Sequence, residues 1–209
     1  MAIPTPSKEN LIGIVVSVNY ADKLKPTINH NMRFLKKLYV VTDPMDFETF
    51  DAVKEYPNIE LVISSVAKQK EAKFNKSGLL RAAQQIAHTH HRDDWMVIFD
   101  ADTLFPENLW TLLKQEKKNK NTVFLLKRAI YYTKESFEAD KPDKKTNGAG
   151  FFQLYFDKTK MYNPWSKDAG ICDIVFQHRF PIQKELDGWC RHLGQNGLDW
   201  EERISPQWA

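Results

Sequence analysis

Residues 97–106 read VIFDADTLFP, an apolar run that leads directly into two aspartates, Asp100 and Asp102. Such short apolar runs are typical of strands that are buried on both faces of a sheet. In open α/β sheets the carboxyl ends of the strands form the edge where ligands bind, so we expect both carboxylates at that edge. Two carboxylates this close repel each other unless a proton or a cation lies between them, and a hard divalent cation also binds phosphate oxygens. The alternative is a pair of solvated carboxylates in a turn.

Upstream of this acidic pair, apolar runs alternate with segments of helical periodicity. LIGIVVSV (11–18), KKLYVVT (36–42) and IELVISS (59–65) are short and rich in apolar residues, many of them β-branched, as buried strands are. Residues 20–34 and 77–91 instead place apolar residues at the spacing of amphipathic helices. The alternation predicts an α/β fold with a mixed, mostly parallel central sheet flanked by helices.

Downstream of the pair, TVFLLKRAIYY (122–132) and the end of GAGFFQLYF (148–156) predict two further strands, and Pro106 opens a short helix. Residues 134–145 are polar and carry charges of both signs, so we expect a surface loop there. From Tyr162 on, the chain is rich in Trp, His, Asp and Arg, a composition that favours a functional site over a buried core.

Length and composition limit the class of protein. The 209 residues suit a single domain, 1–209, and a formal net charge of only +3 argues against a dedicated nucleic-acid binder. The two cysteines, Cys172 and Cys190, form no CxxC pair, so neither a structural zinc site nor a disulfide framework is expected. The first residues lack the layout of a signal peptide, and no apolar run approaches the ~20 residues that span a bilayer. We therefore expect a soluble, cytoplasmic protein.

Three short segments carry a resemblance to a known family. FDADTLFP (99–106) resembles the Asp-x-Asp segment of glycosyltransferases with the GT-A fold, including glycogenin-like enzymes. FNKSGLLRAAQQIA (74–87) is similar to the helix that leads into the site of that family, and RHLGQNGLDW (191–200) is similar to its His-x-x-Gly region. The resemblance implies one nucleotide-diphospho-sugar transferase domain, with a donor-binding part over about residues 8–106 and an acceptor part over about residues 107–209.

The same resemblance implies a set of metal ligands. Asp100 and Asp102 would bind Mn²⁺ or Mg²⁺, His192 would be the third ligand, and Ala101 would lie against the donor. Neutral imidazole is a reasonable manganese ligand beside carboxylates. For His192, whose HLG spacing departs from His-x-x-Gly, the alternative is a histidine that only forms a hydrogen bond beneath a loop.

Two basic residues precede the acidic strand. Under the resemblance, Lys76, Arg81 or both would meet the donor's phosphates or its sugar. The alternative is that both are surface charges on an amphipathic helix.

The polar ends of the first two strands are candidates for contacts with the nucleobase. Ser17, Asn19 and Tyr20 follow the first strand, and the Tyr20 ring could stack on a pyrimidine. Asp43 follows the second strand, where its carboxylate could accept a hydrogen bond from the ring N–H of uracil. These contacts favour a uridine nucleotide-sugar, although Asp43 could instead be an ordinary turn residue.

The acceptor side carries fewer distinctive residues. The turn NGAG (147–150) resembles the small-residue turn beneath the transferred sugar in this fold, and Asp173 lies where inverting members of the superfamily carry the base for the acceptor hydroxyl. Asp173 could instead cap the N-terminus of a helix. The rival carboxylates, and then the tryptophans that could stack on sugars, are Asp168 and Asp187, and Trp165, Trp189 and Trp200.

Taken as a set, these residues predict a metal-dependent, inverting glycosyltransferase (a hexosyltransferase) that moves a sugar from a UDP-sugar to a hydroxyl of a glycan or another acceptor. A sugar-nucleotide nucleotidyltransferase is the alternative enzyme, but it would carry a glycine-rich loop after the first strand, and SVNYADKLKP (17–26) contains no glycine. A non-catalytic sugar-binding module would need no acidic pair at the end of a strand. We expect neither a nucleic-acid partner nor a membrane span.

Overall fold

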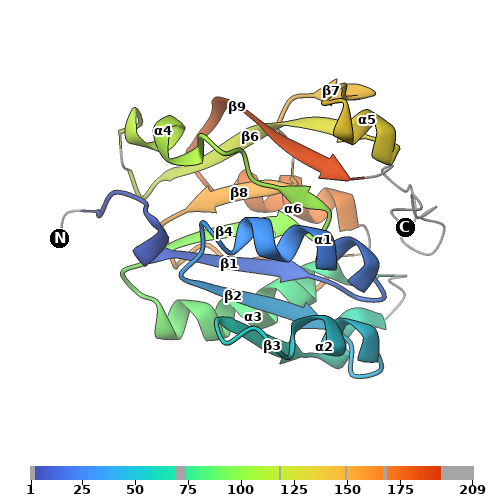
Figure 1. Cartoon of the computed structure of the whole chain (residues 1–209). Coiled ribbons are helices and arrows are strands. Elements are labelled where there is room, and N and C mark those ends of the chain that lie inside the picture. Colours follow the sequence, from blue (N-terminus) through green and yellow to red (C-terminus); the bar gives the residue numbers. More distant parts are fainter. Residues whose placement is uncertain (1–2, 69–73, 118, 149, 167–168, 194–209) are drawn as a thin grey trace.

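The computed structural model of the chain describes residues 3–68, 74–117, 119–148, 150–166 and 169–193. These residues form a mixed sheet in the order β3-β2-β1-β4-β8-β6-β9-β5, with β7 paired to β6 (Figure 1). The parallel part consists of β1 (Leu11–Val16), β2 (Lys37–Thr42), β3 (Ile59–Ile63) and β4 (Trp95–Asp100). The other strands are β5 (Thr103–Leu104), β6 (Thr122–Tyr131), β7 (Lys144–Thr146), β8 (Phe152–Tyr155) and β9 (Ile182–Leu193). β8 is antiparallel to both β4 and β6, whereas β6 and β9 are parallel.

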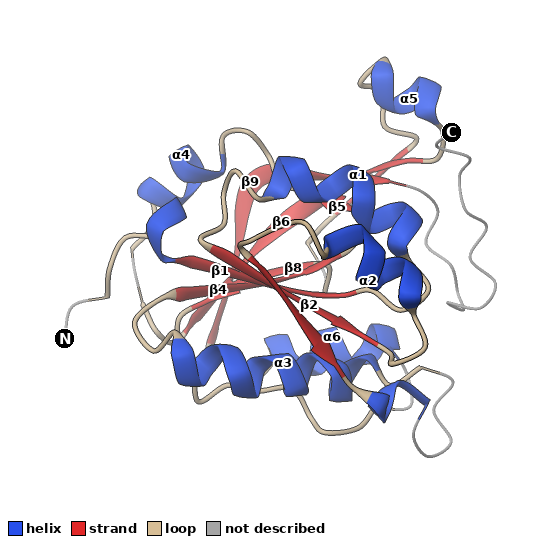
Figure 2. Cartoon of the chain, turned by 60° about the horizontal axis from the view of Figure 1, so that its bottom comes forward, coloured by secondary structure: helices blue, strands red, loops and turns tan. Residues whose placement is uncertain are grey.

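Helices cover both faces of the sheet. They are α1 (Ala21–Asn31), α2 (Phe47–Val53), α3 (Lys76–His90), α4 (Leu109–Lys114), α5 (Lys134–Glu138) and α6 (Ala169–Gln177), with short 3-10 turns at Lys8–Asn10 and Ser65–Lys68. In Figure 2, α1, α2 and α4 lie on one side of the strands, and α3 and α6 lie on the other. This arrangement confirms the predicted α/β fold with a mixed sheet between helices.

Two hydrophobic cores lie on the two faces of the sheet, because successive side chains of a strand point in opposite directions. Leu11 and Val15 of β1 pack in the core under α1 and α4, whereas Ile12 and Ile14 of the same strand pack in the core under α3. Burial on both faces explains why the parallel strands read as nearly continuous apolar runs.

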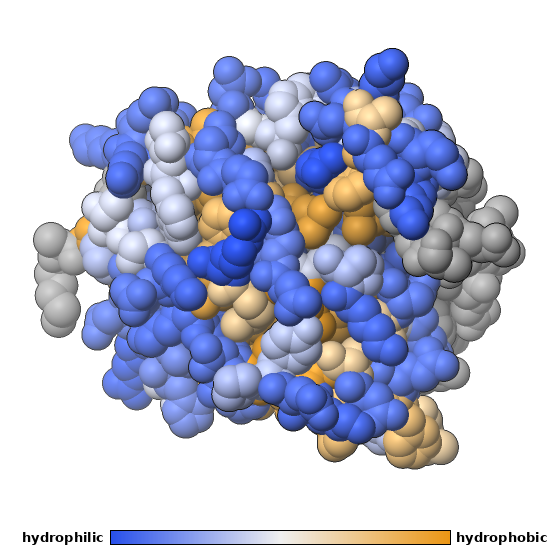
Figure 3. All heavy atoms as spheres, in the orientation of Figure 1, coloured by the Kyte–Doolittle hydropathy of each residue, from blue (hydrophilic) through white to orange (hydrophobic). Residues whose placement is uncertain are grey.

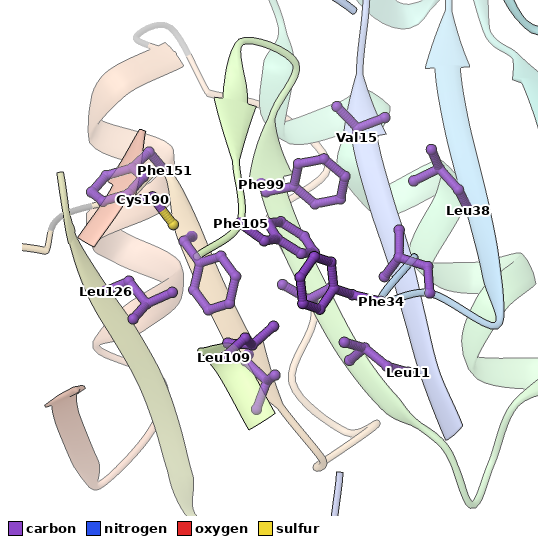
Figure 4. Packing of buried hydrophobic residues seen from close by; sticks show 14 of the residues in the cluster. Leu11, Val15, Phe34, Leu38, Phe99, Phe105, Leu109, Leu126, Phe151 and Cys190 are labelled. Atoms are coloured by element: carbon purple, nitrogen blue, oxygen red, sulfur yellow. The ribbon is translucent and has the colours of Figure 1, made fainter. Parts of the chain in front are cut away.

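Phe105 connects the segment after β4 to the first of these cores. Its ring lies edge-on to Phe99 at a centroid distance of 4.8 Å and to Phe152 at 5.3 Å, and its residue is 1% exposed (Figure 4). Burying an aromatic side chain of this size contributes roughly 1.5–3 kcal/mol. The loop that carries Asp100 and Asp102 is therefore anchored to the core three residues after Asp102.

On the face shown in Figure 3, hydrophilic side chains predominate and hydrophobic ones show mainly in the spaces between them. None of the helices in the described part of the chain has the length and apolar character needed to span a bilayer.

Two regions differ from the sequence-based expectation. The expected loop at 134–145 contains α5 and most of β7, which pairs with β6. The C-terminal region expected to be poor core material contributes β9, a long strand in which Leu186 and Cys190 are buried. The strand β9 was hard to recognise because small or polar residues, Gly188 and His192, occupy buried positions in it.

Candidate metal centre

The two aspartates lie at the carboxyl edge of the parallel strands, as predicted. β4 ends at Asp100, and Asp102 follows just before β5. β5 pairs with β9 in a register that sets Thr103 opposite His192. This pairing brings a histidine from the end of the described chain to within 3.2 Å of Asp102, measured from His192 Nε2 to Asp102 Oδ1. One ligand atom from each of Asp100, Asp102 and His192 lies within 4.8 Å of the others.

Burial makes this group a fit for a divalent cation. Asp102 and His192 are each 2% exposed, and among the described atoms His192 Nδ1 forms no hydrogen bond, nor does Asp102 Oδ1, whose 3.2 Å contact with His192 Nε2 is an ion-pair contact only. A buried polar atom without a hydrogen bond is costly, and metal coordination is one way to satisfy a carboxylate oxygen. The two carboxylates suit either Mg²⁺ or Mn²⁺, and the imidazole suits Mn²⁺ better than Mg²⁺. The donor set therefore supports the predicted ligands.

Lys76 lies between Asp100 and Asp173. The side chain of Asn75 accepts a hydrogen bond from Gly78 N and caps α3, which sets Lys76 at the first position of the helix. Lys76 Nζ is 2.7 Å from Asp100 Oδ1 and 2.7 Å from Asp173 Oδ2. Burial alone would lower the pKa of Lys76, but the charges of the two carboxylates outweigh it, so the pKa is raised.

Asp173 is buried within α6 rather than at its N-cap, so the helix-cap alternative is wrong. Its second oxygen, Oδ1, accepts a 2.7 Å hydrogen bond from the Tyr162 hydroxyl. Burial raises the pKa of Asp173 to about 6, against the opposing effect of Lys76. Sequence reasoning missed Tyr162, because nothing local distinguishes it from a core tyrosine.

The predicted small-residue turn lies directly against Asp173. Gly150 has a φ of +79°, and a Cβ atom at this position would come within 2.8 Å of the Asp173 Cβ. Only glycine meets both demands without strain. Gly148 N donates to Glu185 on β9, while Ala149 of the turn lies outside the described residues.

The residues expected to meet the nucleobase gather at the ends of β1 and β2. Ser17 Oγ lies 2.9 Å from Thr49 Oγ1, and Asn19, with a positive φ of 53°, donates its backbone N–H to Asp46. Asp46 was not predicted. It also accepts hydrogen bonds from Thr42 and from Thr49 N, so it ties both strand ends to α2.

Two further donor-side residues have contacts that bear on their predicted roles. The Tyr20 hydroxyl donates to Asp102 Oδ2 at 3.3 Å, which places this ring beside the acidic pair. Asp43 accepts a hydrogen bond from Met45 N, the contact of a turn residue. Ala101 is buried between the two aspartates.

The remaining predicted residues lie outside the Asp100, Asp102 and His192 group. Arg81 donates to the backbone oxygen of Tyr162. Asp187 is an exposed residue of β9 that pairs with Lys127. Trp165 and Trp189 are half-buried, and Asp168, Trp200 and the HLG glycine lie outside the described residues.

Comparisons with known proteins bear on the fold. No protein-family model and no curated protein matches the chain. Among solved structures, the inositol-1-phosphate CTP transferase from T. maritima has a TM-score of 0.53 at 10% identity, covering 89% of this chain and 90% of its own. A mycobacterial protein has a TM-score of 0.55 at 10% identity, covering 90% of this chain and 68% of its own. HddC from Yersinia pseudotuberculosis has a TM-score of 0.51 at 7% identity, covering 83% and 88%. At these identities the likeness is one of fold, and it agrees with the layered α/β architecture.

Proposed function

We propose that the chain is a divalent-metal-dependent transferase that acts on a nucleotide-diphosphate sugar, and that the group it moves is the sugar. The observation that carries this proposal is the group of Asp100, Asp102 and His192 at the carboxyl edge of the sheet. That edge is where open α/β sheets bind their ligands. A bound divalent ion there supplies neutralisation of the charge that develops on a departing diphosphate.

Lys76 is the residue of this chain best suited to help the leaving group. Its ammonium lies 2.7 Å from Asp100, one of the proposed ligands, so a donor phosphate held by the ion would lie near this ammonium. A fixed positive charge in a site with little water stabilises a developing anion strongly. Arg81 would act more remotely, through the chain at Tyr162.

Asp173 is the proposed base for an inverting transfer. Its two oxygens accept hydrogen bonds from Tyr162 and Lys76, and a carboxylate has lone pairs left to accept a third from an acceptor hydroxyl. Its raised pKa, about 6, lies nearer to neutral pH than that of an ordinary aspartate, as suits a general base. Gly150, which has no side chain, lets the turn approach this carboxylate closely.

The donor base is proposed to lie over the ends of β1 and β2, against Ser17, Asn19, Tyr20 and Asp43, with Ala101 beneath the donor. Asn19 and Ser17 are held by α2 residues, so these strand ends form a fixed wall. One carboxylate oxygen of Asp43 would bind the nucleobase of the donor, while the other accepts a hydrogen bond from Met45 N. A uridine nucleotide is the donor that this set favours.

Nucleotidyl transfer is the second candidate, and the fold comparison favours it. One similar structure is that of an inositol-1-phosphate CTP transferase. In nucleotidyl transfer to a sugar phosphate, a phosphate oxygen attacks the α-phosphorus of a nucleoside triphosphate and diphosphate leaves. Against it stands the loop after β1, residues 17–20, which has no glycine and is tied to α2 by side-chain contacts.

The released product separates the two reactions. Purified protein is incubated with Mn²⁺ and either UDP-sugars or nucleoside triphosphates with sugar phosphates, and UDP and inorganic diphosphate are assayed. Glycosyl transfer releases UDP, whereas nucleotidyl transfer releases diphosphate. Asp102→Asn should abolish turnover and Mn²⁺-dependent thermal stabilisation while the circular dichroism stays native. If this variant keeps full activity after chelator treatment, the proposed metal centre is wrong.

A further inference from the structure

The backbone of the metal-binding loop is held by side chains of α1. The Thr27 hydroxyl donates to the carbonyl oxygen of Ala101 at 2.7 Å, and its oxygen also lies 2.9 Å from the carbonyl oxygen of Leu24 in its own helix. Asn31 Nδ2 donates to the carbonyl oxygen of Thr103 at 2.7 Å, and Asn31 Oδ1 accepts from Phe105 N at 3.0 Å. His30 Nε2 lies 2.7 Å from the carbonyl oxygen of Phe105.

The spacing of these contacts follows from the geometry of the two elements. Residues 27, 30 and 31 share one face of a helix, because positions three and four apart are neighbours on its surface. The three carbonyls belong to the turn after β4 (Ala101), to β5 (Thr103) and to the residue that follows β5 (Phe105), and the contacts above place all three toward α1. One helix face can therefore bind alternate carbonyls of the loop. Thr27 is 0% exposed and Asn31 is 1% exposed, so water cannot replace these bonds.

The opposite side of the loop is held by β9. Leu193 N donates to the carbonyl oxygen of Asp102 at 2.8 Å, and Thr103 pairs with His192. The distance between Asp102 and His192 thus depends on the backbone of the loop, which forms hydrogen bonds to α1 on one side and to β9 on the other. A shift of the loop would move one ligand relative to the other.

We infer that Thr27 and Asn31 are positioning residues of the metal centre, which set the distance between the Asp102 and His192 ligand atoms through the loop backbone. This inference rests on the proposed metal-dependent function. Residues that orient metal ligands without touching the ion typically change metal affinity by about 10–100-fold when they are removed. A purely structural role for the same side chains would lower the stability of the fold and leave the affinity of the folded protein unchanged.

The test measures Mn²⁺ affinity by the electron paramagnetic resonance signal of free Mn²⁺, at a temperature where circular dichroism shows each variant to be folded. Thr27→Val keeps the shape of the side chain and removes the donor to Ala101. Thr27→Ser restores the hydroxyl. Asn31→Leu removes both contacts of the amide and provides an independent second variant. Asn29→Leu is the matched control, because Asn29 is an exposed residue of the same helix that contacts Tyr56 and not the loop.

Wild-type protein and Asn29→Leu are expected to bind Mn²⁺ alike, Thr27→Ser within about twofold of them, and Thr27→Val and Asn31→Leu about 10–100-fold more weakly. If Thr27→Val and Asn31→Leu, both folded, bind Mn²⁺ as tightly as wild type, the inference is overturned and the metal centre stands. If wild-type protein itself binds no Mn²⁺, the proposed metal centre is wrong, and the inference fails with it.

Discussion

Lys76→Met is the substitution that best tests the charges of the site, because it removes the ammonium group that lies between the carboxylates of Asp100 and Asp173. Lys76 is 14% exposed in its side chain, and its partners Asp100 and Asp173 are 24% and 6% exposed. At 2.7 Å and an effective dielectric constant of about 20, each pair of unit charges attracts by about 6 kcal/mol before desolvation is subtracted. Breaking a buried ion pair by removing one partner typically costs about 3–5 kcal/mol, since the other charge stays buried.

That loss of stability is large enough to see in a thermal melt. For a protein of about 150–250 residues, 1 kcal/mol shifts Tm by roughly 2–4 °C, so Lys76→Met should lower Tm by roughly 6–20 °C in the absence of metal. Lys127→Met is the matched control. Lys127 also lies 2.7 Å from an aspartate, but Asp187 is 91% exposed, and such surface pairs contribute only about 0–1 kcal/mol.

Mn²⁺ provides the second half of this test. A divalent ion beside Asp100 would replace the missing positive charge, so Mn²⁺ should raise the Tm of Lys76→Met by more than it raises that of wild type. Differential scanning calorimetry with and without Mn²⁺ measures both effects. A difference of 2 °C corresponds to about 1 kcal/mol or less. If Lys76→Met melts within 2 °C of Lys127→Met, Lys76 does not neutralise these carboxylates. The same conclusion follows if Mn²⁺ stabilises Lys76→Met no more than it stabilises wild type.

Three further predictions concern chemistry, donor and pH. Asp173→Asn should lower turnover by about 10²–10⁴-fold with little change in donor affinity, and NMR of the product should show inversion at the anomeric carbon; retention would remove Asp173 as the base. Isothermal titration calorimetry should show tighter binding of uridine than of guanosine diphosphate, and the reverse order would refute the donor assignment. Burial, aided by Lys158, lowers the pKa of His88 to about 4, with Asp157 and the Tyr155 hydroxyl also facing it. Between pH 6.5 and pH 4 the unfolded chain binds a proton at His88 that the folded state does not bind, so the free energy of unfolding should decrease as the pH is lowered through this window. At pH 5 the loss relative to neutral pH should be about 2 kcal/mol in urea melts, and His88→Gln should flatten that dependence.

The sheet and the acidic pair were predictable from sequence for the same physical reason. β4 is buried on both faces, so its apolar run is continuous, and the change to polar residues at Asp100 marks the strand end. Lys76 was predicted as a donor contact, but its pairing with Asp173 was not, because the two lie on α3 and α6 and meet only through the packing of these helices. Pairings across the fold leave no local pattern.

The errors have equally specific causes. α5 begins with a capping box between Thr133 and Ser136, a polar motif that also reads as a turn in sequence. β7 is a three-residue edge strand, Lys144–Thr146, whose lysines suit an edge that must not pair further. In β9, small or polar residues such as Gly188 and His192 take inward positions, which conceals the alternation that marks a strand.

The residues least visible in the sequence are those that act through backbone. Thr27 and Asn31 are polar residues in an amphipathic helix, and by composition alone they belong on its solvated face. A polar side chain is buried only where it finds a partner, and the partners here are carbonyl groups of residues 101 and 103, which lie more than 70 positions away along the chain. Because every residue has a carbonyl group, the residue types in the loop do not indicate which carbonyl accepts these hydrogen bonds. Metal ligands, by contrast, must be residues of particular chemistry, which is why Asp100, Asp102 and His192 could be proposed as ligands from the sequence, whereas the residues that bind the backbone of their loop were found only in the fold.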